Sequence, residues 1–173
     1  MTQDEVCAII APTAACAGWR TGIGPERLLN AVANVADELI AGGVRVFLTG
    51  LDEGAGLVCA GAVATRRRRD PHIELMAVMP YRDYINDWPP ALRDHCAGLT
   101  VDFSGIGWVD AVQKPGSFTW RDTLLMDQAG TVLAVYDGST GNPADFAVRY
   151  ALRARRRVIR LDPYNGKVER FQV

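Results

Sequence analysis

A loop of small and polar residues that follows an apolar run is the part of this sequence best suited to chemistry. Residues 131–135 are all apolar or β-branched and continue into Tyr136, which predicts a strand buried on both faces of a parallel sheet. The turn residues that follow are Asp137, Gly138, Ser139, Thr140, Gly141 and Asn142. Pro143 then suits the first position of a helix. Backbone N–H groups at a helix start bind anions, and glycine lets a phosphate approach closely. The pattern predicts an anion site, with an ordinary strand-to-helix turn as the alternative.

The elements that would position this loop alternate between strands and helices. We expect strands at 6–10, 44–49, 73–79, 101–103, 131–136 and 158–161, and helices at 25–41, 57–69, 91–99, 118–128 and 143–156. An Asn-Gly turn at 165–166 predicts a terminal hairpin or a covered sheet edge. Such alternation is typical of an α/β protein with a mostly parallel central sheet between two layers of helices.

Ligands of such sheets bind at the carboxyl ends of the strands. Three expected strands end at Thr49, Met79 and Tyr136 with glycine or proline close behind, so these ends are expected to share one edge. The glycine-rich stretch 104–117 is expected to be a loop over the sheet edge, either a lid over the pocket or a plain connection. This edge is therefore the predicted functional edge of the molecule.

The composition indicates one domain that spans residues 1–173. The formal net charge is −1, and 49% of the residues are hydrophobic. A nearly neutral chain has no strong field to attract nucleic acid or an acidic membrane. The arginine runs 66–69 and 155–157 fall at the ends of expected helices, where arginine complements the helix dipole. Nucleic acid is therefore not an expected partner.

Patterns for a membrane span, a leader or a metal site are not found in the sequence. No stretch approaches the ~18 consecutive apolar residues of a membrane span, and the first residues are acidic, unlike a secretory leader. The four cysteines, Cys7, Cys16, Cys59 and Cys96, lack the spacing of metal ligands. We expect buried reduced thiols in a cytoplasmic protein, with no metal and no required cofactor.

Four short motifs occur in order between residues 44 and 161. Thr49-Gly50 is followed by Gly54, and Pro80-Tyr81 is followed by Trp88. Arg121 opens a segment that runs into Tyr136-Asp137-Gly138, and the small-residue loop and its helix complete the series. Their order and spacing resemble the SLOG superfamily, a Rossmann-like group with the plant LOG enzymes, the DNA-uptake protein DprA and the bacterial YpsA-like proteins. The YpsA-like branch resembles this chain most. The resemblance implies a Rossmann-like three-layer sandwich.

The chain departs from the pattern of this superfamily at several positions. Gly56 stands where an aspartate follows the second turn, Gly130 replaces a frequent aspartate, and Asp122 replaces an asparagine. The last loop reads Gly-Asn-Pro at 141–143 in place of Gly-Gly-Thr. The opening motif of the superfamily corresponds either to residues 11–13 or to residues 17–20, and both registers stay open.

The resemblance implies a sensor or regulatory protein that binds a nucleotide-derived ligand, such as ADP-ribose, NAD or AMP. Backbone amides at 50–54 and 138–142 would hold phosphates, and Asp137 would accept from ribose hydroxyls. Tyr81 or Trp88 would stack on a base, and Arg121 would pair with a phosphate. For three of these residues a purely structural role is the alternative: Trp88 packs a loop, Arg121 pairs with a carboxylate, and Asp137 caps the turn.

An enzyme is the second function that the resemblance implies. LOG enzymes cleave the N-glycosidic bond of nucleoside monophosphates with an arginine and a glutamate, and Arg121 and Asp145 are the corresponding candidates here. Asp145 is alternatively a first-turn acid that favours the helix dipole. DprA-like binding of single-stranded DNA is the least favoured function, because it needs a continuous basic groove. The apolar residues Phe146, Val148 and Tyr150 are expected to lie in the core, with a homodimer contact as the alternative.

Overall fold

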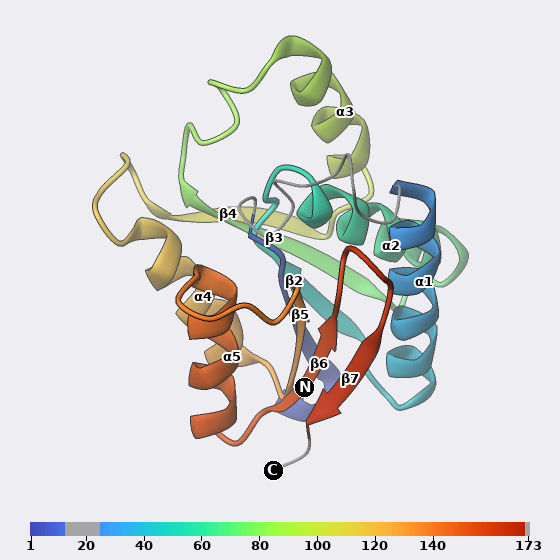
Figure 1. The fold of residues 1–173 in the computed structure, drawn as a ribbon. Coiled ribbons are helices and arrows are strands. Elements are labelled where there is room, and N and C mark those ends of the chain that lie inside the picture. The colour runs from blue at the N-terminus through green and yellow to red at the C-terminus, as the bar shows by residue number, and fades with distance from the viewer. Residues whose placement is uncertain (13–24, 172–173) are drawn as a thin grey trace.

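The fold is a seven-stranded sheet between two layers of helices (Figure 1). This is a computed structural model, and it describes residues 1–12 and 25–171. Residues 17–20, which form one register of the opening motif, and Cys16 lie outside the described residues, as does Thr13. In chain order the elements are η1 (Gln3–Glu5), β1 (Val6–Ile10), α1 (Pro25–Ala41), β2 (Val46–Thr49), α2 (Ala55–Arg69), β3 (Glu74–Tyr81), α3 (Pro90–Thr100), β4 (Gly105–Asp110), α4 (Ser117–Gln128), β5 (Thr131–Val135), α5 (Pro143–Arg153), β6 (Arg157–Leu161) and β7 (Val168–Phe171).

The strand order β4-β3-β2-β1-β5-β6-β7 confirms the expected α/β class. Strands β1 to β6 pair in parallel, and β7 pairs antiparallel with β6 at one edge of the sheet. The chain adds strands in one direction from β1 to β4 and then returns to the other side of β1 with β5. The order therefore reverses between β1 and β5, which is where open α/β sheets form a crevice at the carboxyl ends of their strands.

Alternating residues of the central strands separate two hydrophobic cores. On one face Cys7 and Ile9 of β1 pack with α1 and α2, and on the other face Val6, Ala8 and Ile10 pack with α4 and α5. All five residues are buried, as expected for a strand covered on both faces. Figure 1 shows α4 and α5 side by side on the face opposite α1 and α2. The protein is thus a three-layer sandwich of the Rossmann-like type.

Two expectations about the strands were wrong. The fourth strand is β4, at Gly105–Asp110, within the stretch that was expected to be a loop, whereas residues 101–103 form a turn after α3. Gly105 and Gly107 weaken the strand pattern of β4. Pairing with β3 compensates, because the side chain of Met76 covers Gly105 and Met79 lies beside Trp108. Pro80, expected to follow β3, lies inside it.

The expected terminal hairpin and the expected burial of the cysteines are confirmed for the described residues. Gly166 has a φ of +72°, and the turn at 165–166 joins β6 to β7. Cys7, Cys59 and Cys96 are buried and form no disulfide. Within the described residues, every helix is too short or too polar to cross a lipid bilayer.

Candidate functional site

A cavity of about 500 Å³ lies between the first turns of α4 and α5. Helices that follow parallel strands start at the carboxyl edge of the sheet, so this cavity lies at the predicted functional edge. Its lining residues come from α4, from the loop after β5 and from α5: Phe118, Thr119, Asp122, Gly141, Asn142, Pro143, Phe146 and Arg149. The volume is within the range of small-molecule sites, ~300–1,000 Å³.

The loop 137–142 that forms one wall is held by its own hydrogen bonds. Asp137 Oδ1 accepts from the backbone N–H of Ser139 at 2.9 Å, and Asn142 Nδ2 donates to the carbonyl of Ser139 at 2.9 Å. At the start of α5, Asn142 Oδ1 accepts from the N–H of Asp145, and Asp145 Oδ2 accepts from the N–H of Gly141, both at 2.9 Å. Asn142 is thus the N-cap of α5, and Asp145 binds the residue that precedes the cap. Asp137 thus caps the turn, which is the structural role given above as the alternative to ribose binding.

Gly138 and Gly141 of this loop both have a positive φ, but they differ in the space that surrounds them. Gly138 has a φ of +87°, and a Cβ there would lie 2.5 Å from Nη1 of Arg160, whose guanidinium stacks on Tyr136. Gly141 has a φ of +80°, and a Cβ there would point into open space. Within the described residues, the N–H groups of Thr140 and Asn142 have no internal acceptor. The Gly141 side of the loop therefore presents accessible backbone to the cavity.

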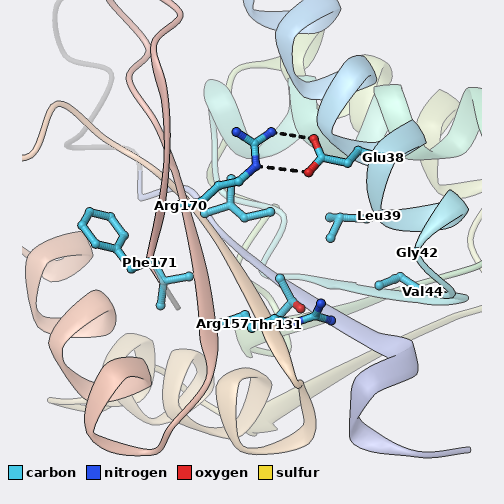
Figure 2. A pocket seen from close by; sticks show the side chains of 10 residues that line it. Glu38, Leu39, Gly42, Val44, Thr131, Arg157, Arg170 and Phe171 are labelled. Atoms are coloured by element: carbon cyan, nitrogen blue, oxygen red, sulfur yellow. Dashed lines mark hydrogen bonds and ion pairs between the residues drawn. The ribbon is translucent and has the colours of Figure 1, made fainter. Parts of the chain in front are cut away.

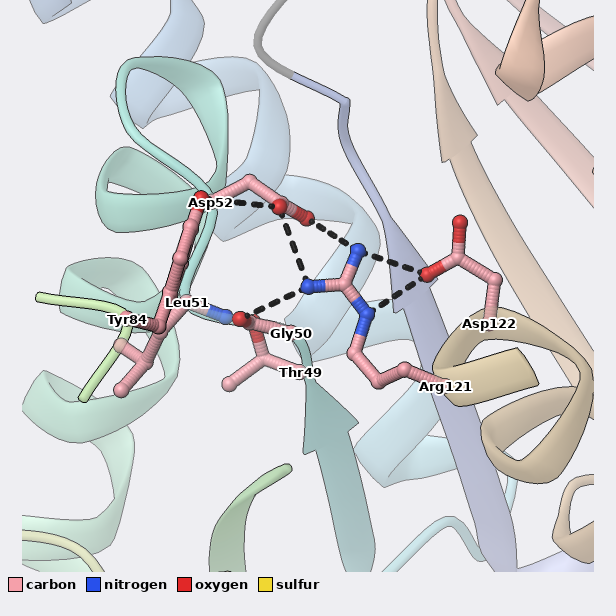
Figure 3. A network of polar contacts seen from close by, with 7 residues as sticks. All are labelled: Thr49, Gly50, Leu51, Asp52, Tyr84, Arg121 and Asp122. Carbon is pink, nitrogen blue, oxygen red and sulfur yellow. Dashed lines mark hydrogen bonds and ion pairs between the residues drawn. The ribbon is translucent and has the colours of Figure 1, made fainter. Parts of the chain in front are cut away.

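Arg121 lies at the centre of a buried polar network next to the cavity (Figure 3). Nη1 donates to the carbonyl of Gly50 and to Oδ1 of Asp52, both at 3.0 Å, and Nη2 donates to Oδ2 of Asp52 at 3.1 Å. Nε and Nη2 both contact Oδ1 of Asp122 at 2.8 Å. These contacts occupy all five N–H groups of the guanidinium. The structure thus shows Arg121 paired with carboxylates, and leaves no free donor for a phosphate.

Burial and charge shift the ionisation of this network. Burial alone would lower the pKa of Arg121, but Asp52 and Asp122 raise it above its usual value. Burial raises the pKa of Asp122 to about 6; Asp52 adds to this shift, and Arg121 opposes it. Asp122 is therefore the acid of the network that changes charge near neutral pH.

The loop after β2 is shaped around Arg121. Thr49 and Gly50 are buried, and the hydroxyl of Thr49 accepts from the N–H of Leu51 at 3.3 Å. A Cβ on Gly50 would lie 2.5 Å from the guanidinium carbon, so only glycine fits at this position. Gly54 is half-buried and precedes α2 with a φ of 85°. Thr49 and Gly50 are therefore buried, and Gly50 packs directly against the guanidinium of Arg121.

An aromatic cluster lies beside this loop. Tyr84 has ring centroids 5.5 Å from Tyr81, 5.3 Å from Trp88 and 5.5 Å from Phe118, all edge to face. Trp88 is buried in a hydrophobic cluster with Met79 and Tyr84, so it packs the loop after β3. Pro80, within β3, is buried as well. Phe118 joins this cluster to the cavity, and the guanidinium of Arg121 lies 5.5 Å from its ring centroid.

The structure brings the predicted site residues together in two groups. Gly141 and Asn142 line the cavity, and Asp137, Gly138, Ser139, Thr140 and Asp145 belong to the same loop and helix start. The second group belongs to β2, β3 and the loops after them; Gly50 contacts Arg121, and Tyr81 and Trp88 contact Tyr84. Its members are Thr49, Gly50, Gly54, Pro80, Tyr81 and Trp88. Asp145 is buried, its Oδ2 is bonded to Gly141 and Arg149, and these hydrogen bonds lower its pKa.

Several residues that line the cavity, Thr119 among them, were not predicted as site residues from the sequence. Phe118, Asp122 and Arg149 line it, and the only signal was that Asp122 replaces an asparagine of the resembling superfamily. Phe146 was expected in the core, but 47% of it is exposed, because it belongs to the outer edge of the first turn of α5. Val148 is buried, as expected.

A second, smaller cavity of about 210 Å³ lies at the opposite edge of the sheet, beneath the end of α1 (Figure 2). Thr131 and Arg157 at the starts of β5 and β6 line it, and the ion pair between Glu38 and Arg170 spans it, with Nε 3.1 Å from Oε1. It lies at the amino ends of the parallel strands, away from the edge where such sheets bind ligands.

The fold and the cavity together define an α/β protein of the Rossmann-like type with a candidate site at the carboxyl edge of its sheet. No known protein-family model matches the sequence, and no curated protein is significantly similar to it.

Replacing Arg121 by methionine is expected to lower the free energy of unfolding by about 3–5 kcal/mol, because two buried carboxylates would lose their partner. Arg68→Met is the matched control, since Arg68 forms a largely exposed pair with Asp102 and should change stability by about 0–1 kcal/mol. Urea unfolding monitored by tryptophan fluorescence measures both. A loss below about 1 kcal/mol for Arg121→Met would contradict the central role of this network.

The raised pKa of Asp122 predicts how stability depends on pH. Between the unfolded value near 4 and the folded value of about 6, the folded state binds more protons than the unfolded chain. The stabilisation is therefore complete below pH 4 and is lost as the pH rises through 6, by at most about 1.4 kcal/mol per pH unit. Relative to Asp122→Asn, the wild type should lose stability across this window in urea unfolding. Parallel curves for the two proteins would show that Asp122 does not titrate there.

Proposed function

We propose that this protein binds a nucleotide-derived ligand of the ADP-ribose, NAD or AMP class in the cavity between α4 and α5, as a sensor or regulatory protein. The observation that carries this proposal is the cavity itself. It has the volume of a small-molecule site, it lies at the carboxyl edge of a parallel sheet, and the loop predicted to bind anions forms its wall.

The start of α5 supports the binding of a phosphate. The open face at Gly141 leaves backbone accessible, and the N–H groups of Thr140 and Asn142 in the same loop have no acceptor among residues 1–12 and 25–171. The positive end of the helix dipole favours an anion at this position. Arg149, which is paired with Asp145, lines the cavity with 58% of its side chain exposed and adds a positive charge at the rim.

The aromatic lining supports the binding of a base. Phe118 contributes a ring from α4 and Phe146 contributes one from α5, and both line the cavity and are partly exposed. Exposed aromatic rings in a concave site are suited to stack on a flat heterocycle. These two residues take the role for which Tyr81 and Trp88 were predicted, since Trp88 is buried.

Binding is favoured over N-glycosidase activity. Arg121 uses its five N–H groups inside the protein, and the Oδ2 atom of Asp145 is occupied by Gly141 and Arg149. A catalytic pair must reach the reacting atoms, and neither residue lines the cavity. Arg121 is instead a positioning residue, because it orients Asp122 and holds the loop after β2.

Membership of the SLOG superfamily and its YpsA-like branch is part of the same proposal. Its support is the order of the motifs and the Rossmann-like sandwich in which they occur. A cytoplasmic location is proposed because the buried cysteines Cys7 and Cys96 form no disulfide, and reduced thiols persist in reducing compartments. Homodimer formation and DNA binding gain no support from the described residues.

A methyl group on Gly141 tests the proposed cavity. Gly141→Ala places a Cβ on the open face of the loop and is expected to weaken the binding of ADP-ribose, NAD or AMP at least tenfold, as measured by calorimetry. Gly43→Ala is the matched control, because Gly43 also has a positive φ (+103°) and open space but lies between α1 and β2. Both variants carry a similar backbone strain.

The same ligands should raise the melting temperature of the wild type by several degrees, since a ligand at 100 times its Kd adds ~2.7 kcal/mol. Equal affinities for Gly141→Ala and Gly43→Ala would place the ligand elsewhere. No binding of any of the three ligands by the wild type would reject the proposed function. Release of a free base during the assay would favour the glycosidase.

A further inference from the structure

Asp122 contacts the buried guanidinium of Arg121 and also lines the cavity. Only 9% of it is exposed, and Oδ1 accepts two contacts from Arg121 at 2.8 Å. The other oxygen, Oδ2, has no hydrogen-bond partner among the residues that the structure describes (Figure 3). Asp122 lines the cavity, so the space in front of Oδ2 is where a ligand would lie.

The surroundings of Oδ2 make it unfavourable for this oxygen to stay without a hydrogen-bond donor. Phe118, Phe146 and Pro143 offer no hydrogen-bond donor, and the polar lining residues Thr119, Asn142 and Arg149 make no hydrogen bond with Oδ2 in the part of the chain that the structure describes. Arg121 cannot turn toward Oδ2, because its five N–H groups are already bonded. A carboxylate oxygen in an apolar cavity is costly unless a donor reaches it. A ligand that brings such a donor gains more here than it would in water.

We propose that Asp122 selects ligands whose flat ring carries an exocyclic amino group, by accepting an N–H hydrogen bond at Oδ2 while the ring lies among Phe118 and Phe146. This inference rests on the proposed function and assigns the base specificity of the same site. It makes Asp122 the specificity-determining residue, and Arg121 holds the carboxylate in place through its two contacts with Oδ1.

The selection follows from the chemistry of a carboxylate, which accepts hydrogen bonds and does not donate them. An amino group on the ring satisfies Oδ2, whereas an oxo group at the same position places a second acceptor against it. Sites built around a buried polar group reject ligands that leave it unpaired, by more than apolar contacts achieve. A 6-aminopurine should therefore bind better than the matching 6-oxopurine.

The charges around Asp122 set the pH range in which this selection operates. Arg121 from α4 and Asp52 from the loop after β2 belong to its network, and Arg149, paired with Asp145, faces the cavity from α5. Burial raises the pKa of Asp122 to about 6, so the carboxyl is ionised at pH 7.5 and largely protonated at pH 5. A protonated carboxyl can donate to an oxo group, so acidification should reduce the preference for the amino ring.

The test compares ligands that differ only at this ring position. Calorimetry at pH 7.5 with AMP against IMP, and with NAD against its hypoxanthine analogue, is expected to show at least a tenfold preference for the amino form. In Asp122→Asn the preference should fall below threefold, because an amide can both donate and accept. Asp127→Asn is the matched control, because it makes the same substitution on the same helix outside the cavity lining, and it should keep the tenfold preference.

The outcomes separate the two claims. Equal affinity of the wild type for both members of each pair overturns the selection by Asp122 and leaves nucleotide binding intact. Failure of all four ligands to bind overturns both. Should Asp122→Asn not fold, the wild type at pH 5 serves in its place: a preference that is unchanged between pH 7.5 and pH 5 overturns the inference, and a preference reduced at least threefold supports it.

Discussion

A guanidinium inside a protein loses its hydration and must find an acceptor for every N–H group it carries. Arg121 meets this requirement with two carboxylates and one carbonyl, supplied by α4 and by the loop after β2. The contact explains why Gly50 has no side chain and why Asp52 is buried at the start of α2. Since removal of one member leaves another charge unpaired, α4 and the loop after β2 are held in one relative position.

The same contact prepares the cavity between α4 and α5. Arg121 contacts only Oδ1 of Asp122, so the second oxygen of this cavity-lining residue is left for a ligand. The edge-to-face contact of Phe118 with Tyr84 places the Phe118 ring at the same wall. On the facing side, Asn142 and Asp145 cap α5 and hold the loop that presents Gly141. A rigid wall on each side is the arrangement expected of a site that selects its ligand by shape and by one polar group.

The sequence predicted the α/β class, the parallel sheet and the loop after β5, because those depend on local periodicity and turn residues. It failed at β4, where pairing with β3 overrides two glycines of low strand propensity. The role of Arg121 stayed open between a phosphate and a carboxylate, because the partner that decides it, Asp52, is far away in the sequence. The importance of Asp122 and Phe146 depends on how α4 and α5 meet, and no local pattern encodes that contact.

The central claim is that a nucleotide-derived ligand occupies the cavity between α4 and α5. Titration of ¹⁵N-labelled protein with ADP-ribose, followed by two-dimensional amide NMR, tests it most directly. The account predicts shifts that concentrate at Thr119, Gly141 and Asn142, with the amides of Leu39 and Val44 at the second cavity unchanged. Shifts that concentrate at Leu39 and Val44, or no shifts at saturating ligand, would contradict it.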